Sequence, residues 1–399
     1  MRNEPIVAVE IGTSTIRAVA AESEENGGCS ILALAEIPSR GVRKGEVSSL
    51  KDLSVCIDAA IRKIEPELER PVRRVVVALS GSRVSSRRST GRWAVDGEIT
   101  EEDCKKARDD ARNVPLPPGQ VIMRTVFRTY RVDGVETLNP VGLEGAVLEA
   151  DMLVVHTTGT HCRTVVGVFK DLDLDVEDIY FSGLCAATSV LSPAQKHEGV
   201  ALLDLGAGTT DYVLYADQTI ADAGSLPVGG DHVTNDIARA FRLTTEAARN
   251  LKHSHGQAMI QATGRTNRIQ LPVEPEAPPR VAILSDLETV IHVRMEETFQ
   301  LIRDRLRSGG FRTEQIHGLV LTGGGSCLPG VSDLAERVFG LHCDIGAPVC
   351  NPNLSDAYAR PDYATIVGAV ERIHRERLHA AESRIDVVGA VKRWFGLKK

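Results

Sequence analysis

The chain has 399 residues, of which 42% are hydrophobic and 25% are charged, and its formal net charge is -7. This length exceeds what one hydrophobic core usually serves, so we expect at least two domains, and the composition excludes a largely disordered or fibrous chain. The negative net charge gives no overall attraction for nucleic acid, and we predict no nucleic-acid partner.

The first residues and the cysteines indicate the cellular compartment. The apolar stretch that begins at Ile6 ends at Glu10, which is too short for a signal peptide, and no other apolar run is long enough to span a bilayer. The 8 cysteines are scattered and include no Cys-x-x-Cys pair. This pattern argues against a disulfide scaffold or a zinc ribbon, and we expect a protein of the reducing cytoplasm.

Two distant segments of the chain follow the same plan. Residues 6–20 predict two β-strands joined by a turn of small residues, and residues 200–215 predict the same arrangement. In each, an apolar strand ends in an acidic residue, an apolar residue and a glycine, before a hydroxyl-rich turn and a second strand. Glu10 corresponds to Asp204 in this match. An internal match over so long a separation indicates two related halves.

The rest of the chain mixes strand and helix patterns. Residues 318–322 predict a third apolar strand, which ends in three consecutive glycines and leads into a helix that begins near Val331. Further helices are predicted over 51–64, 101–112, 231–252 and 285–308. The stretch 83–166 alternates strand signals with one helix and predicts a small inserted domain, whereas 271–280 is a proline-rich connector. The predicted fold class is therefore α/β.

The glycine-rich turns are candidate phosphate sites. Glycine lets successive backbone N–H groups converge on one point, and phosphate oxygens are natural occupants of such a nest. Two matching turns and a glycine triplet predict nucleotide binding, with Mg²⁺ held directly or through water by Glu10, Asp204 and Asp211. The predicted nucleotide-binding residues of these turns are Gly12, Thr13, Ser14, Thr15, Gly206, Gly208, Thr209, Thr210, Gly323, Gly324 and Gly325.

The order of these motifs resembles that of the actin-like ATPase superfamily. The motifs are Glu10-Ile-Gly-Thr-Ser, Asp204-Leu-Gly-Ala-Gly-Thr-Thr-Asp and Leu321-Thr-Gly-Gly-Gly. Within the superfamily, the chain looks like the FtsA family of bacterial cell division proteins. Stretches similar to that family include Ser80-Gly-Ser-Arg-Val-Ser-Ser and Gly229-Gly-Asp-His-Val-Thr-Asn-Asp-Ile-Ala. The resemblance covers nearly the whole chain.

The resemblance implies an actin-like fold, in which two ribonuclease-H-like domains flank a nucleotide cleft and a small α+β domain is inserted. It implies bound Mg-ATP and polymerisation of the chain into filaments. The implied parts are 1–82 with 167–199 as the first core domain, 83–166 as the inserted interaction domain, 200–228 with 317–374 as the second core domain, 229–316 as a partner-binding subdomain, 375–385 as a linker and 386–399 as an amphipathic membrane-targeting helix.

The implied function is that of a cell-division adaptor. Such a protein binds the C-terminal tail of the tubulin-like FtsZ, tethers the FtsZ ring to the cytoplasmic side of the cell membrane at the division septum, and recruits later division proteins through its inserted domain. The family binds the FtsZ tail near a Pro-Arg-x-Glu-Glu helix, and Val293 replaces the proline of that pattern here. We expect Arg294 and Glu297 to contact the partner.

Two positions depart from the pattern at the predicted nucleotide site. Actin-like proteins commonly hold the ribose and adenine with a glutamate three residues before a lysine, whereas here Arg249 precedes the nucleotide-binding candidate Lys252. A guanidinium cannot accept hydrogen bonds from ribose hydroxyls, so this contact is lost or is supplied from elsewhere. Thr15 stands where the family often has lysine, and Arg17 is a candidate substitute for that cation. We identify no general base, so catalytic residues stay unassigned and we expect at most a slow ATPase.

The last segment of the chain has an amphipathic pattern. As a helix, residues 386–399 place apolar and aromatic side chains on one face and basic side chains along its flanks. This combination suits the headgroup boundary of an anionic membrane and resembles the membrane-targeting helix of the family. Packing of the helix on the protein's own core is the alternative. The predicted membrane-contacting residues are Val387, Val388, Val391, Lys392, Arg393, Trp394 and Phe395.

Two other functions stay open at this point. One is a pilus-assembly module similar to PilM, which shares the fold and a similar insert, and the other is a small-molecule kinase with the same two-turn cleft. A kinase needs a carboxylate base for its substrate hydroxyl, and the sequence offers no distinct candidate. The basic and aromatic terminal segment argues against both.

Overall fold

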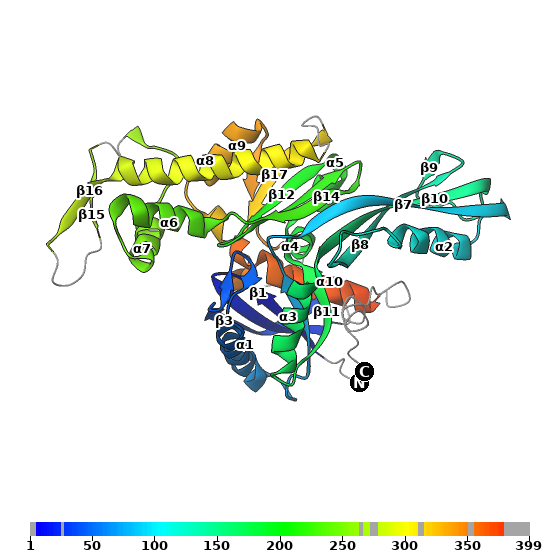
Figure 1. Cartoon of the computed structure of the whole chain (residues 1–399), viewed down its shortest axis with the longest axis horizontal. Coiled ribbons are helices and arrows are strands. Elements are labelled where there is room, and N and C mark those ends of the chain that lie inside the picture. Colours follow the sequence, from blue (N-terminus) through cyan, green and yellow to red (C-terminus); the bar gives the residue numbers. More distant parts are fainter. Residues whose placement is uncertain are drawn as a thin grey trace.

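The computed structural model describes residues 5–24, 28–262, 266–271, 278–309, 315–349 and 355–378. Two five-stranded mixed sheets form the centre of the molecule, with helices on their faces, which confirms the predicted α/β class (Figure 1). A four-stranded sheet with one helix extends to one side of the second sheet, and a largely helical subdomain extends to the other side.

The first sheet has the strand order β11-β6-β1-β2-β3, in which β1 pairs with β2 antiparallel and with β6 parallel. Its strands are β1 (Ile6–Ile11), β2 (Thr15–Ser23), β3 (Cys29–Pro38), β6 (Arg74–Leu79) and β11 (Asp175–Phe181). Successive side chains of a strand point to opposite faces, and both faces of β1 are buried. Val9 and Ile11 pack with α1 (Leu50–Ile64) and α3 (Gly159–Lys170), whereas Ile6 and Ala8 pack with α10 (Ala364–Leu378).

The second sheet repeats this plan with the order β14-β13-β12-β17-β18, in which β12 pairs with β13 antiparallel and with β17 parallel. Its strands are β12 (Val200–Leu205), β13 (Thr210–Ala216), β14 (Thr219–Leu226), β17 (Gly318–Thr322) and β18 (Cys343–Ile345). Leu203 packs toward the helices of the second half, whereas Leu202 packs in the cluster shared with the first domain. The match between residues 6–20 and 200–215 therefore reflects two halves of one topology.

Most predicted helices lie close to their expected limits. They are α1, α2 (Glu101–Arg112), α8 (Leu284–Ser308) and α9 (Val331–Phe339), and the chain also forms α4 (Ser182–Val190) and α5 (Pro193–Glu198). The single helix predicted over 231–252 is wrong, because α6 (Gly230–Phe241) and α7 (Thr245–His255) take its place. Arg242 has a left-handed backbone (φ 52°) that ends α6, and the side chain of Thr244 accepts a hydrogen bond from Ala247 N at the start of α7.

The inserted domain is an antiparallel sheet of order β7-β10-β8-β9 with α2 packed on one face. Its strands are β7 (Ser85–Glu98), β8 (Gln120–Val132), β9 (Val135–Thr137) and β10 (Glu144–Thr158). Gly91 allows the close approach of α2, since a Cβ atom there would lie 2.1 Å from the carbonyl oxygen of Ala107. Ile99, Cys104 and Leu148 belong to a small separate core, as expected for a folded α+β insert.

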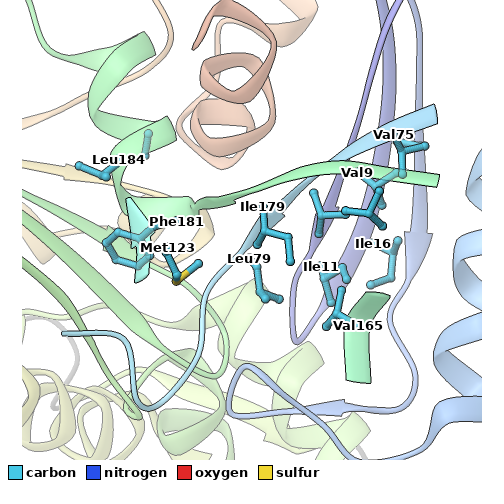
Figure 2. Close-up of a cluster of buried hydrophobic side chains, with 14 of the residues drawn as sticks. Val9, Ile11, Ile16, Val75, Leu79, Met123, Val165, Ile179, Phe181 and Leu184 are labelled. Carbon is cyan, nitrogen blue, oxygen red and sulfur yellow. The ribbon is translucent and has the colours of Figure 1, made fainter. Parts of the chain in front are cut away.

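The base of the insert contacts both core domains. Met123 of β8 packs in the large cluster that lies against the first sheet (Figure 2). Arg124, on the same strand, forms an ion pair with Asp178 of β11 (3.5 Å), and Arg128 Nη1 donates a hydrogen bond to the carbonyl oxygen of Ile220 on β14 (2.5 Å). The insert is therefore fixed to each half of the molecule by a buried arginine.

Two of the implied domain boundaries do not follow the packing. The boundary at 166 falls inside α3, which packs on α1 and β11, so we propose that the insert ends before this helix. Helix α10 was placed in the second core domain, but it packs on β1, β2 and α4 and continues into the implied linker 375–385. The other domain ranges remain our proposal. The segment 386–399, with all predicted membrane-contacting residues, lies outside the described residues.

Short elements complete the described structure. The hairpin of β15 (Arg268–Leu271) and β16 (Arg280–Ile283) flanks the proline-rich connector, and β4 (Val42–Arg43) pairs with β5 (Glu46–Val47). Single 3₁₀ turns cover Glu65–Glu67, Gly324–Cys327, Asp356–Tyr358 and Pro361–Tyr363. Within the described ranges, no helix combines the length and the apolar character needed to cross a bilayer.

Candidate functional site

A cleft of about 350 Å³ lies where the two core domains meet. Its wall comes from the β1–β2 turn, the β12–β13 turn, the start of α6 and the glycines that follow β17. Every residue predicted for a nucleotide or for Mg²⁺ lines this cleft. These residues are Glu10, Gly12, Thr13, Ser14, Thr15, Asp204, Gly206, Gly208, Thr209, Thr210, Asp211, Lys252, Gly323, Gly324 and Gly325.

The two hairpin turns have equivalent geometry. Gly12 N donates a hydrogen bond to the carbonyl oxygen of Thr15 (3.1 Å), and Gly206 N donates the matching bond to Thr209 (3.0 Å). In both turns a Cβ atom at the glycine would collide with that same carbonyl oxygen. The repeated Gly in the sequence therefore has one physical cause in both halves, which is the tight closure of the turn.

The two turns also touch each other across the cleft. A Cβ atom at Gly208 would lie 2.3 Å from Thr13 Oγ1 and 2.9 Å from the Cα atom of Lys44, so only glycine fits here. Thr13 Oγ1 accepts a hydrogen bond from Gly45 N (3.0 Å) and is held in this position. The cleft is thus closed on one side by direct contact between the domains.

The start of α6 is tied to the second turn. Gly230 N donates a hydrogen bond to the carbonyl oxygen of Gly206 (3.0 Å), and Asp231 N donates one to that of Ala207 (2.8 Å). Gly229 permits this approach, since a Cβ atom there would lie 2.5 Å from the Gly206 oxygen. Because Gly230 and Asp231 line the cleft, the positive end of the α6 dipole lies at its wall, where it favours an anion.

Three acidic side chains lie at the turns, where Asp211 is buried and Glu10 and Asp204 are half-buried. Burial raises the pKa of Glu10 and of Asp211 to about 7, and repulsion from Asp204 adds to both shifts. Burial also raises the pKa of Asp204. Asp204 accepts a hydrogen bond from Thr365 Oγ1 (2.9 Å), and Asp211 accepts one from Ser80 Oγ (2.5 Å). The cleft therefore concentrates negative charge that the folded protein compensates only in part.

These carboxylates fit a cation only with further ligands. Within the part of the chain that the structure describes, no three His, Cys, Asp or Glu side chains gather closely enough to hold a metal ion. Hard oxygen donors and excess negative charge are what Mg²⁺ prefers, and Mg²⁺ usually keeps several waters. Of the two predicted arrangements, the residue positions thus fit coordination through water or phosphate oxygens better than direct coordination by all three carboxylates.

Arg17 lines the cleft but is not a free substitute for the missing lysine. Its guanidinium forms ion pairs with Glu36 (2.8 Å), Glu10 (3.4 Å) and Asp362 (3.4 Å). Arg17 lowers the pKa of Glu10, although burial has the larger, opposite effect. Three carboxylates already pair with Arg17, so a phosphate would have to share its charge, and a partial role as phosphate cation stays a prediction.

Lys252 stabilises the start of α6. Its Nζ donates hydrogen bonds to the carbonyl oxygen of Gly230 (3.0 Å) and to Thr234 Oγ1 (2.9 Å), and burial lowers its pKa to about 8. Arg249, one turn earlier on α7, has its Nη2 atom 3.5 Å from Asp231 Oδ1. Arg249, which replaces the family's glutamate, thus forms an ion pair with Asp231 on the cleft wall.

Sequence reasoning missed several lining residues. Asp231 follows Gly-Gly at a helix start, a signal that could have pointed to a ligand-facing residue. Ser80 and Thr365, which bind the buried carboxylates, carry no local signal. A mainly apolar group of lining residues was also missed. It includes Val233, Met295, Thr298, Leu328 and Pro329.

The predicted partner residues lie on the surface of α8 and are already paired. Arg294 Nε lies 2.5 Å from Asp236 Oδ2 of α6, and the same guanidinium also pairs with Glu297. Val293, next to them, is exposed. A partner carboxylate would therefore have to share Arg294 with Asp236 or displace it.

Two family models match the chain. One, described as "Cell division protein FtsA", matches residues 201–368. The other, described as "SHS2 domain inserted in FTSA", matches residues 81–156, which corresponds to most of the inserted domain.

Curated relatives match over nearly the full length. Cell division protein FtsA of Pseudomonas aeruginosa is 32% identical over 365 residues, which cover 91% of this chain and 88% of the relative. Cell division protein FtsA of Escherichia coli is 29% identical over 400 residues, covering 98% of this chain and 95% of the relative.

Solved structures with similar folds include two from other systems. The PilM-PilN type IV pilus biogenesis complex matches with a TM-score of 0.65 at 21% identity, over 93% of this chain and 99% of that chain. MreB 5 of Spiroplasma citri matches with a TM-score of 0.56 at 13% identity, over 96% of this chain and 100% of that chain. At these identities the likeness concerns the fold alone, and it confirms the predicted actin-like fold.

Proposed function

The chain belongs to the FtsA family of cell division proteins, and from this premise we propose that it is an ATP-binding adaptor of cell division. It tethers an FtsZ ring to the cytoplasmic side of the cell membrane at the division septum, polymerises with other copies, and recruits later division proteins through the insert. The observation that carries the proposal is the cleft, where two equivalent turns, a glycine triplet and three carboxylates converge. We expect at most slow ATP hydrolysis.

The cleft residues fit a magnesium nucleotide. Phosphate oxygens would meet the backbone N–H groups of the two turns and the positive end of α6. Glu10, Asp204 and Asp211 would hold Mg²⁺ through water, and the charge of the ion would offset that of the carboxylates and phosphates. MreB 5 of Spiroplasma citri, which shares the fold, was solved bound to AMPPNP, and this supports a nucleotide here.

The adaptor role rests on two further parts of the chain. We propose that α8 binds the FtsZ tail at the surface around Arg294 and Glu297, and that residues 386–399 contact an anionic membrane. Support for the first comes from the family relationship and from the surface position of these side chains, of which Arg294 is half-buried and Glu297 exposed. Support for the second comes from the amphipathic sequence pattern.

The two other functions have less support. The PilM-PilN complex shares the fold at 21% identity, whereas FtsA proteins are related in sequence over more than nine-tenths of the chain. No observation on the cleft specifically favours a pilus module or a small-molecule kinase.

A titration with Mg-ATP tests the nucleotide site. Wild type and the control Glu102→Gln, on the exposed side of α2, should bind with equal affinity. Asp204→Asn keeps the side-chain volume but removes a metal-side charge, so its affinity should fall by about 10-fold or more. Thermal melts verify that each variant is folded. Absence of ATP binding to wild type, or unchanged binding in both Asp204→Asn and Asp211→Asn, would refute the site.

A further inference from the structure

Asp231 adjoins two chemically different parts of the cleft lining. The glycine turns form one part, and the other part is apolar and includes Val233 of α6 and Met295 of α8. The backbone N–H of Asp231 donates to the carbonyl oxygen of Ala207 (2.8 Å), which fixes the residue directly beside the second turn. Val233 follows two residues later on the same helix and belongs to the apolar part. Asp231 is therefore a neighbour of both parts.

A nucleotide has the same order of parts. If its phosphates lie at the turns and its base lies against the apolar lining residues, its sugar lies between them, within reach of Asp231. Sugar hydroxyls are donors that need an acceptor inside a cleft, and a carboxylate accepts hydrogen bonds only. The neighbouring Arg249 can donate but cannot accept. This step rests on the nucleotide binding proposed above.

The other described carboxylates of the cleft are in different surroundings. Asp211 is buried and Asp204 is half-buried at the turns, and both accept hydrogen bonds from hydroxyl groups. Glu10 and Asp362 pair with Arg17. By contrast, the side chain of Asp231 is 33% exposed, and its contact with Arg249 is long (3.5 Å). Its carboxylate is thus open to a ligand.

We propose that Asp231 accepts hydrogen bonds from the ribose hydroxyls of the bound nucleotide and makes the site selective for ribonucleotides over deoxyribonucleotides. Arg249 positions this carboxylate and offsets its charge beside the triphosphate. Asp231 thereby makes the contact with the sugar hydroxyls that Arg249, which can only donate hydrogen bonds, cannot make. Asp231 is in this sense the specificity-determining residue of the cleft.

The test compares the affinities of ATP, 2′-deoxy-ATP and 3′-deoxy-ATP by competition against a fluorescent ATP analogue, in the presence of Mg²⁺. Wild type should bind ATP about 10-fold more tightly than at least one of the deoxy analogues, since a site built to bind a hydroxyl rejects the analogue that lacks it. Asp231→Ala should bind ATP only as tightly as it binds the deoxy analogues. Its affinities for the deoxy analogues should stay close to those of wild type. The control Asp236→Ala, on the same helix outside the cleft lining, should keep the wild-type ratio.

The outcomes separate this inference from the proposed function. If wild type binds ATP and both deoxy analogues equally, the assignment of Asp231 is overturned while nucleotide binding stands. A folded Asp231→Ala variant with the wild-type ratio overturns it as well. If wild type binds none of the three nucleotides, the proposed nucleotide function itself fails. The ratio of the affinity for ATP to the affinities for the deoxy analogues is measured on wild type alone. The inference therefore stays testable even if Asp231→Ala does not fold.

Discussion

At the scale of single residues, the buried carboxylates of the cleft set a pH response of the free protein. Burial raises the pKa of Glu10 and Asp211 to about 7, whereas in an unfolded chain such carboxyls titrate near pH 4. Between about pH 4 and pH 7, the folded protein therefore holds protons that the unfolded chain has released. The contribution of these groups to the free energy of unfolding is fully present below this window and is lost as the pH rises through it.

We predict that Asp211→Asn stabilises the free protein at high pH but not at low pH. The amide keeps the shape of the carboxyl, and Ser80 can still donate to its oxygen, but no charge has to be buried. At pH 8 the free energy of unfolding should exceed that of wild type by roughly 1–4 kcal/mol, since each pKa unit corresponds to about 1.4 kcal/mol, and at pH 4 the difference should vanish. Urea unfolding at a series of pH values measures this, and parallel curves for the two proteins would contradict it.

The residue scale also shows what the sequence can and cannot predict. The turns were predictable because their glycines and hydroxyls stand together in short motifs whose chemistry is local. Ser80 was not, because its role depends on Asp211, which lies 131 residues later. The ion pairs of Arg17 were not predictable for the same reason, since Glu36 and Asp362 approach it from other elements. Polar partners that only the fold brings together leave no pattern in the chain.

At the scale of elements, α8 connects the cleft with the proposed partner surface. Met295 and Thr298 of this helix line the cleft, while Arg294 and Glu297 form ion pairs on its surface. A helix of 25 residues can serve both sides, because neighbouring positions project in different directions. A residue of α8 that lines the cleft is therefore adjacent in sequence to a residue of the proposed partner surface.

We predict that Arg294→Glu weakens binding of an FtsZ tail peptide by about 5- to 150-fold, equivalent to about 1–3 kcal/mol for a lost charge-assisted contact. The substitution reverses the charge offered to an acidic tail and also places a carboxylate beside Asp236. Fluorescence anisotropy with the labelled peptide gives the affinity. Arg307→Glu makes the same charge change at an exposed position near the end of α8 and should leave binding unaltered. Equal affinities of all three proteins would remove Arg294 from the partner site.

The elements also differ in how far their placement was predictable. Amphipathic periodicity located α1, α2 and α8 within a residue or two, because each buries one continuous face. The break between α6 and α7 was missed, since Arg242 takes a left-handed backbone without the glycine that usually signals one. Helix α10 was not among the predicted helices, and the sheet on which it packs could not be predicted either, because that choice depends on contacts with distant elements.

At the scale of the whole molecule, α10 joins parts that are distant in the chain. It packs on the first sheet and on α4, and Glu376 in its last turn pairs with Arg124 at the base of the insert. Tyr180 OH also donates a hydrogen bond to Glu376 (2.6 Å). The helix is therefore anchored up to its end by contacts within the described structure. A chain that ends just after α10 should consequently keep the cleft and the insert intact.

This anchoring allows a clean test of the membrane segment. We predict that wild type sediments with anionic lipid vesicles, whereas Trp394→Glu and a chain ending at Glu382 stay in solution. Burial of the apolar face of residues 386–399 would contribute about 25 cal/mol per Å², and each basic side chain would add about 1 kcal/mol near the anionic surface. Trp394 is the most sensitive position, because it combines a large apolar area with an N–H group suited to the interface.

Four measurements make this prediction decisive. Val135→Glu introduces the same charge at an apolar side chain of the insert that is 70% exposed, and it should sediment like wild type. Sedimentation of wild type should fall as the salt concentration rises and should be weak on neutral vesicles, because charge attraction is screened and the basic residues lose their partner. Binding of Mg-ATP should be the same in the truncated chain as in wild type, since α10 is retained whole. If the truncated chain and Trp394→Glu sediment as wild type does, residues 386–399 are not the anchor, and the membrane contact must lie on the folded domains.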